Sequence, residues 1–139
     1  MSNSVIECDF ATFDLSKRSL ITQRIKNICP TEAQIEEYFK ILDSSMASVN
    51  GDFVLLSMGS GIKFDSTKTI IHFFKGIRKI ERKYINEYKK AFIVGISLKN
   101  KLLLPLYNIF ARPIAPRVYV ATEEEGIDLA SLEMGIPYY

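Results

Sequence analysis

The residues best suited to chemistry gather in the stretch 59–68, which reads Gly-Ser-Gly-Ile-Lys-Phe-Asp-Ser-Thr-Lys. Its hydroxyl groups could accept a phosphoryl group, and the amides of its glycine pair give a weak signal for phosphate binding. The same residue types also cap helices, where an oxygen accepts from a backbone amide. Two interpretations stay open, a helix cap and a turn that is phosphorylated or binds a partner. The candidate residues of this turn are Ser60, Gly61, Asp65, Ser66 and Thr67.

The other chemistry-bearing residues form no complete catalytic or metal-binding set. His72 is the single histidine and lies within an apolar helical pattern, which is typical of a half-buried helical residue. The acidic run 123–125 precedes an apolar segment and is expected in the first turn of a helix, where negative charge is favourable. We therefore predict a protein that is not an enzyme and that uses no metal and no cofactor.

The element that must position the turn is the apolar run 53–58, which follows Gly51. An unbroken run of this length indicates a strand buried on both faces. Before it, 10–15 and 19–26 alternate like an antiparallel strand pair. A helix then opens with the capping-box residues Thr31 and Gln34 and stops at 50–51.

Helices and strands alternate through the second half of the chain. Asp65 or Ser66 is expected to cap a helix that Gly76 bends or divides. Strands are expected at 91–97 and 117–121, with an apolar helix at 102–111 between them. Thr122 opens a last helix. Its apolar residues are Ile127, Leu129, Ala130 and Leu132.

This order predicts an α/β fold in one domain spanning residues 1–139. The order is β-β-α-β-α-β-α-β-α, which gives a mixed sheet of about five strands with about four helices packed on it. The length of 139 residues suits a single core. Cys8, expected in the first strand, and Cys29 favour a reducing compartment. With no secretory signal at the start, we expect a cytoplasmic protein.

A cationic segment stands out against a net charge of only +2. Its apolar residues recur at helical spacing, so an amphipathic helix is predicted. Such a helix can meet an anionic membrane surface or an acidic partner, or simply present a solvated face. Nucleic acid is the least favoured partner. The candidate basic surface is Lys75, Arg78, Lys79, Arg82 and Lys83.

The expected helix at 102–111 is apolar on nearly every side. A peripheral helix of this kind needs a cover, which could be a second copy of the chain, as in a homodimer, or a lipid-like ligand. The candidate interface or pocket residues are Leu102, Leu103, Leu106, Ile109 and Phe110.

The order of elements and the turn residues resemble the STAS domains of sporulation anti-sigma-factor antagonists, and more closely the small bacterial SpoIIAA-like (STAS/Sec14-like) proteins. In that family a buried strand leads to an Asp-Ser-Ser-Gly turn whose serine is phosphorylated to switch partner binding. Asp65 and Ser66 match this turn, Thr67 falls on the phosphoserine, and Lys68 stands in place of the glycine. The segment from 112 through Tyr119 to 125 also resembles the family's last strand and helix.

Two functions from different classes follow. The resemblance implies a non-enzymatic regulatory module that binds a protein partner through the turn and the start of the second helix. The alternative is a small apolar-ligand or membrane-surface binding protein that uses helix 102–111 and the basic helix 75–83.

Overall fold

The computed structural model of the chain describes residues 4–17, 19–59, 63–94, 109–111 and 114–134. Within these ranges six strands and three helices have defined bounds. The strands are β1 (Val5–Glu7), β2 (Ala11–Asp14), β3 (Leu20–Ile25), β4 (Phe53–Met58), β5 (Tyr88–Val94) and β6 (Arg117–Val120). The helices are α1 (Glu32–Val49), α2 (Thr67–Lys83) and α5 (Glu123–Met134). The predicted α/β class is confirmed.

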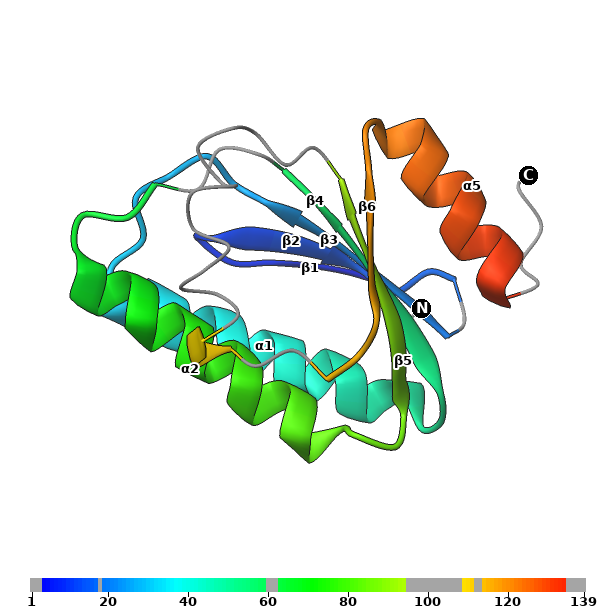
Figure 1. Cartoon of the computed structure of the whole chain (residues 1–139), viewed down its shortest axis with the longest axis horizontal. Coiled ribbons are helices and arrows are strands. Elements are labelled where there is room, and N and C mark those ends of the chain that lie inside the picture. Colours follow the sequence, from blue (N-terminus) through cyan, green and yellow to red (C-terminus); the bar gives the residue numbers. More distant parts are fainter. Residues whose placement is uncertain (1–3, 18, 60–62, 95–108, 112–113, 135–139) are drawn as a thin grey trace.

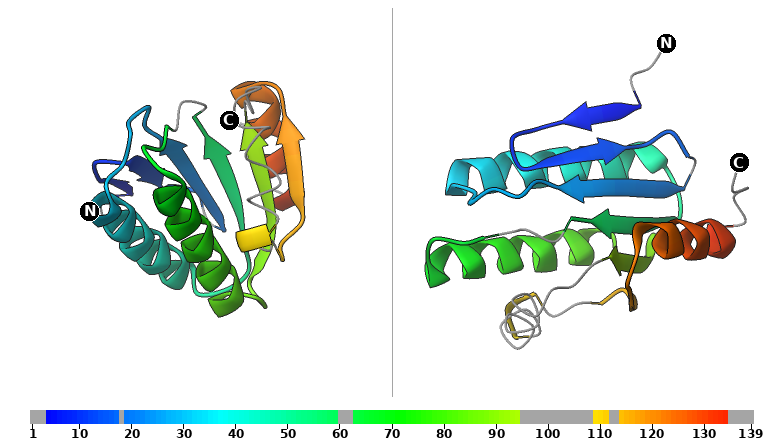
Figure 2. Two further views of the ribbon diagram at one scale, coloured as in Figure 1. Left: turned by 60° about the vertical axis from the view of Figure 1, so that its left-hand side comes forward. Right: turned by 90° about the horizontal axis from the view of Figure 1, so that it is seen from above.

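The six strands lie side by side in chain order in one mixed sheet (Figure 1). β1 is antiparallel to β2 and β2 to β3, whereas β3 to β6 are parallel. A parallel connection must cross over a face of the sheet, and α1 and α2 make the first two crossovers. Both lie on one face, and α5 lies on the other (Figure 2).

Strand β4 is shared by the two hydrophobic cores. Phe53 and Leu55 belong to the core beneath α1 and α2, and Val54 and Leu56 belong to the core beneath α5. None of the four is more than 6% exposed. The prediction of a strand buried on both faces is therefore confirmed.

Helix α1 begins and ends where its sequence signals indicate. Thr31 and Gln34 form a complete capping box, with each side chain accepting from the other residue's backbone amide. Asn50 closes the helix in the left-handed conformation, with φ 56°. Local sequence signals therefore fix both ends of the helix.

An aromatic cluster joins α1 and α2 to the sheet. The ring of Phe73 on α2 lies 5.8 Å from Phe10, 5.9 Å from Tyr38 and 5.6 Å from Phe39, between centroids. Beside it, a Cβ added to Gly76 would lie 2.2 Å from the Phe39 ring. The prediction that Gly76 divides the helix is wrong, because α2 is continuous and the glycine instead lets the two helices approach closely.

Two other expectations, the number of strands and the position of Cys8, need correction. The sheet has six strands rather than about five, because Val5–Glu7 pairs with β2 as an edge strand too short to show a period in the sequence. Cys8 is buried after that strand rather than within it. On α5, Ala130 belongs to the core beneath that helix, and Leu132 is 69% exposed.

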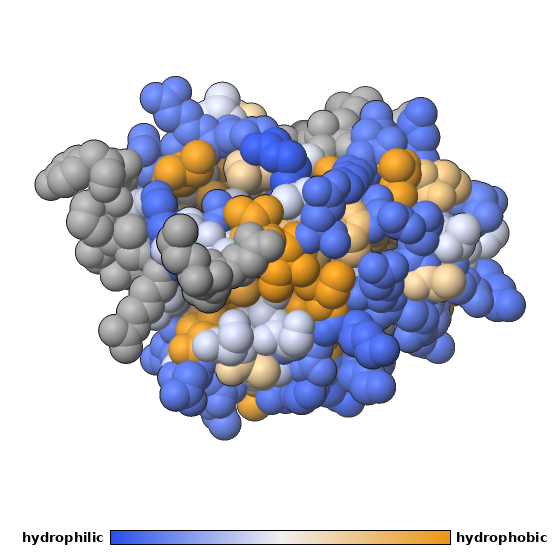
Figure 3. Space-filling model, turned by 180° about the vertical axis from the view of Figure 1, so that it is seen from behind, coloured by the Kyte–Doolittle hydropathy of each residue, from blue (hydrophilic) through white to orange (hydrophobic). Residues whose placement is uncertain are grey.

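The face of the molecule opposite to the view of Figure 1 has a hydrophobic surface in its middle, with hydrophilic residues around it (Figure 3).

Strand β1 at the edge of the sheet has only three residues, and short edge strands limit pairing with other chains.

A buried ion pair fastens α2 to the segment that leads into β6. Glu81 and Arg117 meet at 2.6 Å, with side chains 2% and 9% exposed. Oε1 of Glu81 also accepts from the backbone amides of Ile114 and Ala115, at 3.3 and 3.1 Å. These bonds offset the cost of removing the carboxylate from water.

We predict that Glu81→Gln lowers the free energy of unfolding by about 3 kcal/mol, because it leaves the Arg117 guanidinium buried without its counter-charge. Chemical denaturation measures the change. Glu37→Gln is the matched control on an exposed site of α1 and should stay within about 0.5 kcal/mol of the wild type. Equal stabilities for the two variants would contradict the role assigned to the pair.

Candidate functional site

The turn between β4 and α2 leaves the sheet at the carboxyl end of β4. Gly59 adopts φ 107°, and a Cβ there would lie 2.3 Å from the carbonyl oxygen of Ile25. This glycine therefore allows β4 to end directly against the end of β3. Ser60 and Gly61, two of the predicted turn residues, lie outside the described residues.

The rest of the turn forms the cap of α2. Ser66 is the N-cap, and its Oγ accepts from the Thr69 amide at 3.2 Å. The Thr69 hydroxyl donates to Asp65 at 2.9 Å. The helix-cap interpretation is confirmed for Ser66, whereas Asp65 accepts from the Thr69 side chain; both remain exposed together with Thr67.

The electrostatics of this helix end would suit added negative charge. The first turn of α2 contains no acidic residue, although the amide ends of a helix favour one. The neighbouring Lys68 is exposed and lies 4.0 Å from Glu32. A phosphoryl group on Ser66 or Thr67 would therefore meet the positive end of the helix and a nearby cation.

The predicted basic residues all lie on α2, but their environments differ. Lys75, Lys79 and Arg82 are exposed, and Arg78 is half-buried. Lys83 pairs with Asp43 of α1 at 2.8 Å. These five side chains therefore do not form a single uniform face.

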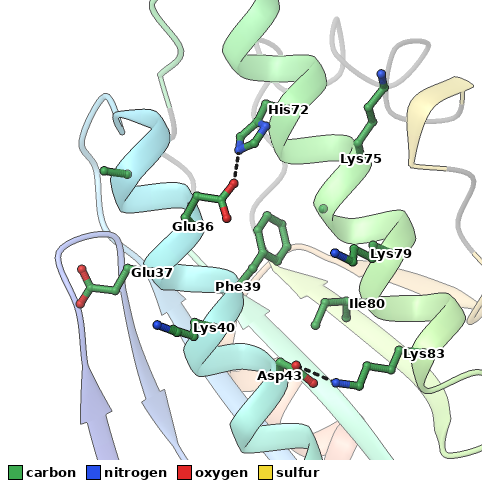
Figure 4. A pocket seen from close by; sticks show the side chains of 12 residues that line it. Glu36, Glu37, Phe39, Lys40, Asp43, His72, Lys75, Lys79, Ile80 and Lys83 are labelled. Carbon is green, nitrogen blue, oxygen red and sulfur yellow. Dashed lines mark hydrogen bonds and ion pairs between the residues drawn. The ribbon is translucent and has the colours of Figure 1, made fainter.

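Part of that surface lines a groove of about 970 Å³ between α1 and α2 (Figure 4). Phe39, Gly76 and Ile80 form its apolar part. The residues that line the groove are Ala33, Glu36, Glu37, Phe39, Lys40, Asp43, His72, Lys75, Gly76, Lys79, Ile80 and Lys83.

Two polar side-chain contacts join the helices along the groove. His72 Nε2 lies 2.9 Å from Glu36, and Lys83 bonds Asp43 (Figure 4). Tyr84 also donates to the Asp43 carboxylate and to its carbonyl oxygen. Because the pairs follow the same chain order on both helices, α1 and α2 run parallel.

These contacts shift the pKa values of two side chains, Asp43 and Tyr84. The hydrogen bond from Lys83, followed by that from Tyr84, holds the pKa of Asp43 below its usual value. Burial, followed by the bond to Asp43, raises the pKa of Tyr84 to about 12. At neutral pH the carboxylate is therefore charged and the phenol protonated, which is the pair of states that the contact requires.

The predicted apolar interface can be followed only at its end. Leu102, Leu103 and Leu106 lie outside the described residues, as does most of the expected helix 102–111. Ile109 is 59% exposed, whereas Phe110 packs against the core beneath α1 and α2.

The other candidate residues have structural partners. Glu123 at the start of α5 accepts two hydrogen bonds of 2.7 Å from Arg24 of β3, which lower the pKa of that glutamate.

Among the described residues there is no group of three side chains that could hold a metal ion. No helix in the described ranges is long and apolar enough to cross a membrane.

Comparison of the chain with protein families, with curated proteins and with solved structures finds no match. The resemblance to SpoIIAA-like proteins therefore stays a prediction from the sequence.

The α1 side of the groove was not predicted from sequence. Glu36, Lys40 and Asp43 occur at helical spacing on the exposed face of α1, which is a signal for a solvated face only. Which of them meets α2 depends on how the two helices are rotated about their axes.

The Asp43 contact predicts a pH dependence of stability. Because its folded-state pKa is lowered, the carboxylate stabilises the fold above its unfolded value, about 3.9, and this contribution is lost as the pH falls through the folded pKa. Urea denaturation should show that the gap in unfolding free energy between wild type and Asp43→Asn is constant near neutral pH and shrinks below about pH 4. In a Lys83→Met background the neutral gap should be smaller. A gap that does not change with pH would contradict the assignment.

Proposed function

We propose that this chain is a non-enzymatic interaction module of the SpoIIAA-like type, which binds a protein partner through the turn before α2 and the first turn of that helix. The observation that carries this proposal is the exposed polar segment from Asp65 to Lys68, held at the carboxyl end of the buried strand β4. In open α/β sheets the carboxyl ends of the strands are the usual place for binding.

The geometry of the segment supports recognition rather than catalysis. The side chains of Asp65, Ser66 and Thr69 are engaged with one another in the cap. This network fixes the backbone of an exposed surface, and a preformed surface binds at a lower entropic cost. Phosphorylation of Ser66 or Thr67 would change the charge of that surface and so switch partner binding.

The switch is tested with protein captured from the native host. We expect the partner retained by the wild type to be lost with Ser66→Asp, because aspartate preserves the N-cap but adds negative charge. Ser44→Asp adds the same charge at an exposed site of α1 and should retain the partner. Phosphopeptide analysis should find modification at Ser60, Ser66 or Thr67. Unmodified residues together with unchanged capture would overturn the proposal.

A second candidate function is binding to an anionic membrane surface or a lipid-like ligand. It is favoured by exposed apolar side chains beside the basic helix. Ile109 is 59% and Ile114 44% exposed, and the hydrogen bond from the Ile114 amide to Glu81 places Ile114 next to α2. Cations next to exposed apolar groups suit an anionic interface.

Flotation with anionic vesicles tests this second function. Binding should weaken as salt is added, and Lys79→Glu combined with Arg82→Glu should abolish it, because both side chains are exposed on α2. Neutral vesicles are the control. A protein that stays with the unbound fraction at low salt would exclude membrane binding.

A further inference from the structure

The groove between α1 and α2 has a regular row of cations along one wall. Lys75, Lys79 and Lys83 follow one another at four-residue spacing on α2, and all three line the groove (Figure 4). Helical residues four apart lie on the same face, about 6 Å from one another. The α2 wall therefore presents positive charge once per helical turn.

The α1 wall differs because it is mixed in charge, with Glu37 and Lys40 beside two carboxylates that already have partners. Glu36 contacts His72, and Asp43 contacts Lys83 and Tyr84. Lys75 and Lys79, in contrast, form no ion pair with any described residue, although the positive charge of Lys79 also helps to lower the pKa of Asp43. A ligand in the groove would meet unpaired cations on the α2 side.

The middle of the groove is apolar. Phe39 is half-buried there, and Gly76 brings no side chain into the space next to that ring. Along α1 the lining extends from Ala33 to Asp43, about 15 Å at the rise of an α-helix. An occupant that fits is elongated, apolar on one side and acidic along one edge.

We propose that the groove binds an acidic amphipathic helix of the partner protein, an inference that rests on the proposed interaction function. The helix would place apolar residues at i, i+3, i+4 and i+7 on Phe39 and Ile80, and acidic residues at four-residue spacing opposite Lys75 and Lys79. Opposite charges along the edge would set the direction of the helix and its register.

The charges on α1 favour a helix over a bilayer. Glu32, Glu36 and Glu37 are exposed on α1. A flat anionic membrane resting on both helices would face these carboxylates together with the lysines. A helix that is acidic along one edge only would set that edge against the α2 wall and turn its other side to the carboxylates of α1.

A designed peptide tests the groove directly. The probe is a lactam-bridged helix of roughly four turns, with leucines on one face and glutamates at four-residue spacing on one flank. Lys75→Glu combined with Lys79→Glu should weaken its binding about tenfold or more, measured by fluorescence anisotropy. The matched control combines Arg82→Glu and Lys89→Glu, which make the same charge change at exposed sites outside the groove, and should weaken binding less than about twofold. Equal effects of the two double variants would overturn the proposal.

Native-host capture separates this inference from the proposed function. Loss of the partner with both Ser66→Asp and the Lys75/Lys79 variant supports the groove. Loss with Ser66→Asp alone would overturn the groove while the interaction function stands. Analytical ultracentrifugation supplies a further test. If the protein self-associates as its concentration rises, and the Lys75/Lys79 variant does not, the groove binds a second copy of the chain. That result would overturn the proposal of a helix from a partner protein.

Discussion

Burial of β4 on both faces is the constraint on which the rest of the structure depends. A strand whose successive side chains are all apolar must be covered twice, because either face left in water forgoes about 25 cal/mol for each square ångström of apolar surface. Helices α1 and α2 cover one face and α5 covers the other. The polar turn then emerges at the end of the strand, outside both cores.

Buried polar contacts decide how the layers fit together. Tyr38 of α1 donates to Gln23 of β3 at 2.7 Å, and Gln23 donates to Ser57 of β4 at 3.0 Å. Glu81 and Arg117 join α2 to the start of β6 in the same way. Since a buried polar group without a partner is costly, these bonds favour a single arrangement of helices on the sheet.

The surface proposed for partner binding is a consequence of this packing. Phe39 and Gly76 meet in the contact between α1 and α2, and both line the groove together with the charged side chains around them. The groove and the capped start of α2 belong to the same helix. A partner could therefore use both surfaces without any change in the fold.

Local signals in the sequence determined the α/β class, the capping box of α1, the strand at 53–58 and the cationic character of α2, because each depends on neighbours within a few residues. Only the tertiary structure decided that Gly76 serves a helix contact, that the strand Val5–Glu7 completes the edge of the sheet, and that Leu132 is exposed. The groove belongs to this second group, since its pairs join residues 36 apart or more in the chain. Such pairs are set by the rotation and separation of packed helices, which no short stretch of sequence encodes.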